Sequence, residues 1–175
     1  MKEHLIEHFL HQINPENRQQ CLDMNQYFLE NYNDAKWAWH KHQAWKWWYQ
    51  QHIQDILNLS HIIYTSIKDF WDIGFKVEDS YETLFLHDIE KPIKYTQNKT
   101  AEVLLLQWKD TYEIRSYFIK KFWVIIRPEI ALALKYMHGE WDDYSPTERK
   151  MSPLWAHCHN CDTYSARVFF DKDRL

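Results

Sequence analysis

Residues 81–95, YETLFLHDIEKPIKY, carry an apolar run directly into an adjacent His87–Asp88 pair. The apolar spacing predicts a helix that begins near Asp79 and reaches this pair. Pro92 disfavours helical geometry at the residue before it, so the pair is expected at or just before a helix end. Neighbouring side chains point about 100° apart on a regular helix, and a break in the helix allows both to reach one point. The segment therefore predicts a helix that ends in two polar side chains.

Glycine scarcity decides the fold class. The chain has 175 residues, of which 45% are hydrophobic, and its only glycines are Gly74 and Gly139. Tight β-hairpins rely on glycine for positive φ angles, so a hairpin-rich fold is unfavourable here. The length suits one domain with a single sizeable core. We therefore predict an all-α protein, a single compact helical bundle of about six to eight helices over residues 1–175.

Break and capping signals set the expected helix boundaries. Residues 138–153 are expected to form a loop. Helices are expected at about 2–12, 16–31, 34–74, 79–88, 100–126, 128–137 and 154–170.

The long helix at 34–74 has a predicted buried stripe. Helical angles measured from Tyr49 place His52 about 60° from the stripe centre, which makes His52 a candidate for an inward-facing role. The stripe residues, all within about 60° of Tyr49 on a helical projection, are Tyr49, Ile53, Ile56, Ile63, Tyr64, Ile67 and Phe70.

Charge and composition argue against several classes of partner. The net charge of −4 and the pI near 6.2 provide no global basic field for nucleic acid. The longest apolar runs, VLLLQW and FWVII, are too short to cross a bilayer, and the first residues lack an apolar signal segment. Three cysteines, an odd number, argue against a disulfide framework. We expect a cytoplasmic protein without a membrane or nucleic-acid partner.

Residues with metal-ligand chemistry recur along the chain. His159 and Asp162 are three residues apart and share a helix face. Imidazole nitrogens and carboxylate oxygens suit divalent Mn, Fe, Zn, Ni, Co or, with enough oxygens, Mg. In chain order the candidates are His52, His87, Asp88, His138, His159 and Asp162.

The segment LFLHDIEKPIKY, residues 84–95, resembles the motif of the HD-domain metal-dependent phosphohydrolase superfamily. That family combines a histidine on an early helix, the His-Asp doublet and a distant aspartate on a late helix. The resemblance covers about residues 45–170, and the all-α fold agrees with it. The metal ligands that it implies are His52, His87, Asp88 and Asp162.

The chain departs from the family pattern in two ways. Glu90 stands where many members carry glycine. His138 and His159 resemble the additional histidines of members that bind two metals, so the resemblance implies one or two ions.

The resemblance implies hydrolysis of a nucleotide or a related small phosphoester by a metal-activated water. Asp88 would orient this water, and Lys91 would contact the phosphate. An equally simple reading of Lys91 is a solvated lysine at a helix end. Two alternatives keep the fold but change the function: a di-iron oxygenase, and a catalytically silent binding module.

Two further motifs have simpler interpretations. Cys158 and Cys161 form a C-x-x-C spacing, but the zinc or redox reading lacks a second ligand pair or a preceding strand, so inward packing of Cys158 as a small apolar group is preferred. The run WAWHKHQAWKWW, residues 37–48, could stack on bases through its aromatic rings. Because the net charge does not favour nucleic acid, core packing or self-association is the preferred explanation, which leaves a homo-oligomer open.

Overall fold

The structure, a computed structural model, describes residues 5–34, 48–140, 143–148 and 150–168. Every regular element within these ranges is helical, which confirms the predicted all-α class. Within the same ranges, no helix is both long enough and apolar enough to cross a membrane. The helices are α1 (Ile6–Leu10), α2 (Pro15–Asn31), α3 (Trp48–Ile67), α4 (Val77–Leu86), α5 (Lys91–Tyr95), α6 (Ala101–Leu106), α7 (Thr111–Lys121), α8 (Pro128–Lys135) and α9 (Pro153–Val168).

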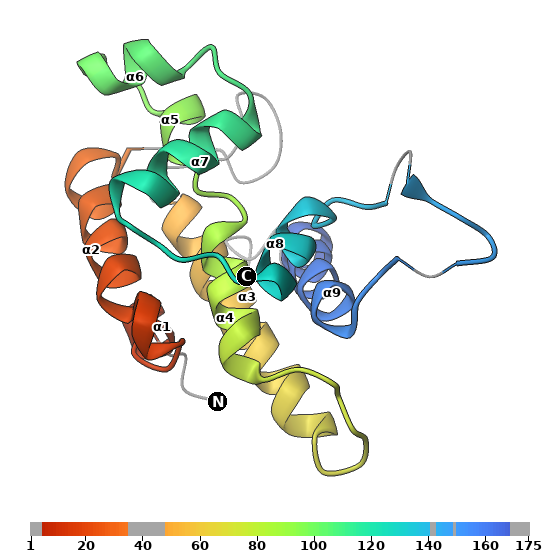
Figure 1. Ribbon diagram of the computed structural model, residues 1–175. Coiled ribbons are helices and arrows are strands. Elements are labelled where there is room, and N and C mark those ends of the chain that lie inside the picture. The colour runs from red at the N-terminus through yellow and green to blue at the C-terminus, as the bar shows by residue number, and fades with distance from the viewer. Residues whose placement is uncertain (1–4, 35–47, 141–142, 149, 169–175) are drawn as a thin grey trace.

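Three helices form the centre of the molecule. Helices α3, α4 and α9 all pack against one another, and α1 and α8 cover them from opposite sides (Figure 1). Every residue of α4 from Asp79 to Leu86 is buried, so α4 is surrounded by protein on all sides. Because α4 has no solvent-exposed face along this stretch, its C-terminal end lies inside the bundle. The His87–Asp88 pair, which follows this end, is therefore buried.

The predicted stripe of α3 is buried in its first half only. Tyr49, Ile53 and Ile56 are buried as predicted. The helix ends at Ile67 rather than at Gly74, and Phe70 is 75% exposed, so its predicted burial was wrong. The first part of the expected helix, which holds nearly all of the tryptophan-rich run, lies outside the described residues.

Helix α4 ends just before the His87–Asp88 pair, close to the predicted position. The helix ends at Leu86, and His87 to Glu90 form a turn before α5 begins. Lys91 is the first residue of α5, with Pro92 in the first turn, where its missing N–H costs no hydrogen bond. The proline therefore lies in the first turn of a new short helix, beyond the turn that follows α4.

The single helix expected at 100–126 was wrong. Asp110 begins α7 with a capping box, since its side chain accepts from the Glu113 N–H at 2.7 Å and the Glu113 side chain accepts from the Asp110 N–H at 3.3 Å. Helix α7 ends at Lys121, and Trp123 follows with a φ of 59°. The capping box at its start and the left-handed residue after its end thus delimit α7 within a segment whose apolar content predicted one helix.

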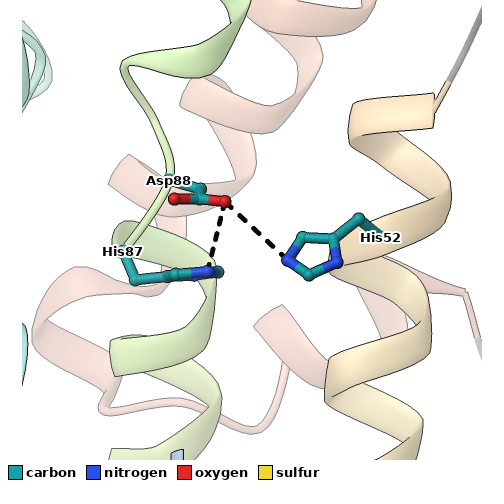
Figure 2. A group of neighbouring side chains, drawn as sticks. All are labelled: His52, His87 and Asp88. Carbon is teal, nitrogen blue, oxygen red and sulfur yellow. Dashed lines mark ion pairs between the residues drawn. The ribbon is translucent and has the colours of Figure 1, made fainter. Parts of the chain in front are cut away.

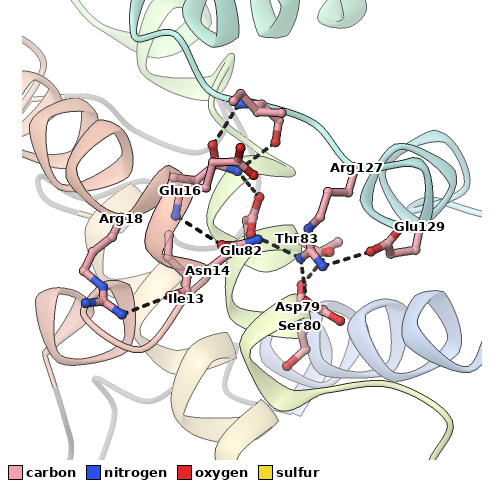
Figure 3. Close-up of polar contacts among 12 residues, drawn as sticks. Ile13, Asn14, Glu16, Arg18, Asp79, Ser80, Glu82, Thr83, Arg127 and Glu129 are labelled. Atoms are coloured by element: carbon pink, nitrogen blue, oxygen red, sulfur yellow. Dashed lines mark hydrogen bonds and ion pairs between the residues drawn. The ribbon is translucent and has the colours of Figure 1, made fainter.

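A buried polar network joins α2 and α4 to the segment before α8. Asn17 donates to Glu82 Oε1 at 2.6 Å and to the Ile125 carbonyl at 2.7 Å, and its side-chain oxygen accepts from the Ile125 N–H at 2.8 Å. Arg127 lies 2.5 Å from Asp79 and 3.5 Å from Glu82, which are both on α4 (Figure 3). These bonds fix the chain that leads into α8 against the central helix.

Candidate metal centre

Three helices contribute the four predicted metal ligands. His52 lies within α3, His87 and Asp88 follow the last residue of α4, and Asp162 lies on α9. Because these helices pack against one another, their side chains converge. Figure 2 shows His52 and His87 directed towards the Asp88 carboxylate from two neighbouring helices.

The separations of the four side chains suit a bound ion. The Nε2 atoms of His52 and His87 lie 3.8 Å and 3.4 Å from Asp88 Oδ2. The same two atoms lie 3.2 Å and 3.7 Å from Asp162 Oδ1. Metal–ligand bonds of about 2.0–2.2 Å in tetrahedral geometry place neighbouring ligand atoms about 3.3–3.6 Å apart. The observed spacing is therefore close to the edge length of a tetrahedral site.

Each imidazole is oriented through its other nitrogen. His87 Nδ1 donates to the Leu84 carbonyl at 2.6 Å, and His52 Nδ1 lies 3.1 Å from Ser165 Oγ. A carbonyl oxygen can only accept, so Nδ1 of His87 carries a proton and Nε2 faces the carboxylates, where its lone pair would be available to an ion in the neutral ring. Nε2 of His87 makes no hydrogen bond with the described residues. This arrangement is the one that metal-binding histidines adopt, and the residues fit a divalent ion.

Burial makes the charges at this centre interdependent. His52, His87 and Asp88 are at most 1% exposed, and the Asp162 side chain is 14% exposed. Burial by itself lowers the pKa of His87, but the Asp88 and Asp162 carboxylates outweigh it and raise this pKa to about 10. Burial likewise opposes ionisation of Asp88 and Asp162, and the neighbouring imidazoles nevertheless hold both carboxyl pKa values below their usual range. Without an ion, a protonated imidazole supplies the compensating positive charge.

Lys91 adds a second cation beside the doublet. Its side chain is partly buried, and its ammonium lies 5.8 Å from the centre of the Tyr95 ring. Burial alone lowers the pKa of Lys91, but the carboxylates of Asp88 and Glu90 outweigh burial and raise it. Lys91 therefore remains charged beside the His87–Asp88 pair.

Glu90 is directed towards Arg115. It is 2% exposed, and its Oε2 lies 3.9 Å from Arg115 Nη2. Arg115 also donates to the His87 carbonyl and, at 3.3 Å, to the Leu134 carbonyl. The residue that departs from the family pattern is thus part of the contacts that hold the turn after α4 in place.

The two further histidines differ in their contacts. His138 follows α8 with a half-exposed side chain, and its Nδ1 lies 3.9 Å from Asp162 Oδ2. His159 Nδ1 donates to the Met137 carbonyl at 2.7 Å, and its ring lies beside Trp155. His138 therefore borders the centre, whereas His159 is bound to the backbone after α8. Their role as ligands of a second metal stays a prediction.

The C-x-x-C cysteines pack inside the bundle. Cys158 and Cys161 are both fully buried, and Cys158 Sγ lies 3.9 Å from the Ser80 carbonyl. Burial raises the pKa of the Cys161 thiol to about 12, and that of Cys158 is also raised. Neutral buried thiols behave as small apolar groups, which agrees with the inward packing expected from the sequence.

Sequence reasoning missed two residues that support the centre. Ser165 lies three residues after Asp162 on the same helix face, and this spacing is a signal that could have found it. Arg115 offers no such signal, because it reaches the His87 carbonyl from a helix that pattern reasoning did not connect with the doublet.

Comparisons of the chain with protein families, with curated proteins and with solved structures find no match in any of the three. The resemblance of residues 84–95 to the HD-domain motif accordingly stays a prediction from the sequence. The structure itself shows a buried group formed by His52, His87 and Asp88 that can hold a metal ion.

Proposed function

We propose that this protein is a metal-dependent phosphohydrolase that acts on a nucleotide or a related small phosphoester. The observation that carries the proposal is the convergence of two imidazole Nε2 atoms and two carboxylates at 3.2–3.8 Å. The HD-like order of these residues along the chain supports the same function.

The ligand set favours a transition metal. His52, His87, Asp88 and Asp162 would hold the ion, and two imidazoles suit Mn, Fe, Co, Ni or Zn better than Mg. A bound divalent ion lowers the pKa of a coordinated water towards neutrality and neutralises phosphate oxygens.

The remaining steps belong to the protein's own side chains. The Asp88 carboxylate, held in place by the turn after α4, orients the attacking water and accepts its hydrogen bond. Lys91 offers a charged ammonium within one turn of Asp88, where it binds the phosphate and offsets the charge that moves to the leaving group. The slight exposure of Asp162, 14% of its side chain, marks the side from which substrate would enter.

The test combines metal content with activity. We expect purified protein to bind a divalent metal and to release phosphate from members of a nucleotide panel supplied with Mn, Co, Ni or Mg. His87→Ala and Asp88→Asn should each lose the ion and at least about 100-fold of the activity, since each removes a ligand. His11→Ala, which removes an exposed histidine of the N-terminal region, is the matched control and should change neither.

The outcomes separate the alternatives. Retention of both metal and activity by His87→Ala and Asp88→Asn would contradict the proposal. Two equivalents of iron with a visible absorption band and no phosphate release would indicate the di-iron oxygenase. Wild-type protein with neither metal nor activity would indicate a binding module.

A further inference from the structure

A cavity of about 470 Å³ lies between α7 and α8. Its volume falls in the range of about 300–1,000 Å³ that is typical of small-molecule sites. Its apolar wall comes from both helices and from the segment between them, and it consists of Ile119, Ile126, Ala131 and Leu134. The polar contacts described above use none of these four side chains.

The cavity adjoins the metal centre through two of its lining residues. His138 lines the cavity, and its Nδ1 lies 3.9 Å from Asp162 Oδ2. Arg115 also lines it and donates to the His87 carbonyl. The cavity and the metal centre therefore share a border, which His138 and Arg115 form.

The charges around the cavity are of one sign. Arg115, Lys120 and Lys135 contribute cations, and none of the described residues that line it carries a carboxylate. Lys135 is paired with Asp143 at 2.6 Å and Arg115 with Glu90 at 3.9 Å, which leaves Lys120 as the lining cation that pairs with no described carboxylate. Tyr112, which is 77% exposed, adds an aromatic ring at the rim. Apolar walls, cations and an aromatic face together suit a flat apolar group attached to an anion.

We propose that this cavity binds the aromatic leaving group of an aryl or nucleoside phosphomonoester while the phosphate lies at the metal centre. This inference rests on the function proposed above and adds the substrate class: a phosphoester of an aromatic-bearing alcohol rather than of a small aliphatic one.

Two phosphonates of equal head-group charge provide the test, because the protein cannot hydrolyse their P–C bond. Isothermal titration of Mn²⁺-loaded protein should give about tenfold tighter binding of 1-naphthylmethylphosphonate than of methylphosphonate, from the apolar area that the ring system buries. Ala131→Trp fills the cavity from an exposed position on α8 and should reduce this ratio to within twofold, with unchanged methylphosphonate affinity. Leu132→Trp adds the same side chain one residue further, outside the lining, and should keep the wild-type ratio.

A second variant guards against misfolding. Tyr112→Ala removes a largely exposed ring, which folding does not require, and should lower the affinity for the naphthyl compound about threefold. Equal affinities of wild type for the two phosphonates, or an unchanged ratio in Ala131→Trp, would overturn the inference while metal-dependent methylphosphonate binding still supported the hydrolase. If the protein binds neither metal nor methylphosphonate, the proposed function itself fails.

Discussion

His52 and His87 are held by different partners on the side away from the carboxylates. His87 has a backbone carbonyl, which moves only with α4, whereas His52 has the hydroxyl of Ser165 on another helix. The Nδ1 contact of His52 therefore depends on the docking of α9, and the Nδ1 hydrogen bond of His87 does not.

This difference predicts the effect of Ser165→Ala. The substitution removes the hydroxyl that orients the ring through His52 Nδ1, so metal affinity should fall about 10- to 100-fold. Titration of the metal-free protein with Mn²⁺ measures the change. Thr163→Ala, an exposed position two residues earlier on α9, should bind the ion like wild type. Equal affinity of the two variants would show that Ser165 does not orient His52.

Residue patterns predicted the four proposed ligands but not their supports. The doublet, an inward-facing histidine and a late aspartate can be recognised because residue type and order along the chain can be read directly from the sequence. Arg115 and Ser165 act through contacts across helices, and such contacts depend on packing that a sequence pattern does not contain. The hydrogen bond from His159 to the Met137 carbonyl could not be predicted for the same reason, because it depends on where the chain after α8 lies.

At the scale of elements, the end of α7 shows a helix stop without glycine. The Val124 N–H donates to the Ile119 carbonyl at 2.9 Å and the Trp123 N–H donates to the Lys120 carbonyl at 3.2 Å, which together form a Schellman motif. Trp123 occupies its left-handed position with a φ of 59°. In a chain with two glycines, this motif has no sequence signal, and for this reason the predicted helix ran on to residue 126.

Trp123→Gly should stabilise the protein. The left-handed conformation costs a residue with a Cβ about 1–2 kcal/mol, and the 81% exposed indole loses little packing when removed. We expect a net gain of about 1 kcal/mol in the free energy of unfolding, measured by urea denaturation. Trp123→Ala removes the same indole but keeps Cβ, so it should show no such gain. A comparable gain in both variants would mean that the indole, and not the backbone, is unfavourable.

The network between α2 and α4 predicts a loss of stability in Asn17→Ala. The substitution leaves the buried Glu82 carboxylate and both Ile125 backbone groups without the amide that bonds them, which should cost about 2–4 kcal/mol. The exposed Gln19→Ala on the same helix should cost less than about 0.5 kcal/mol. Thermal and urea unfolding measure both, and equal stabilities of the two variants would contradict the role of the network.

At the scale of the whole molecule, His157 links stability to pH. Its Nε2 lies 2.9 Å from the buried Ser60 hydroxyl, and burial lowers its pKa from 6.5 to about 4. As the pH falls, the unfolded chain takes up this proton first. The contribution of His157 to folding stability is therefore fully present above about pH 6.5 and decreases towards pH 4, by on the order of 2–3 kcal/mol.

His157→Gln should remove this part of the pH dependence. Urea denaturation of wild type and variant between pH 4 and pH 7 would show their unfolding free energies converging as the pH falls, because only wild type loses the histidine contribution. Parallel curves for the two proteins would contradict it.

The four proposed ligands lie on α3, at the end of α4 and on α9. This distribution sets the order in which the proposed metal centre can assemble. Helix α9 leaves the ribosome after the other two, so a nascent chain that has made His52, His87 and Asp88 still lacks Asp162. Ion capture through all four groups would therefore have to follow translation and docking of this helix. Uptake of an ion would expel the proton of the imidazole, so acid and a metal ion would compete for the same side chains.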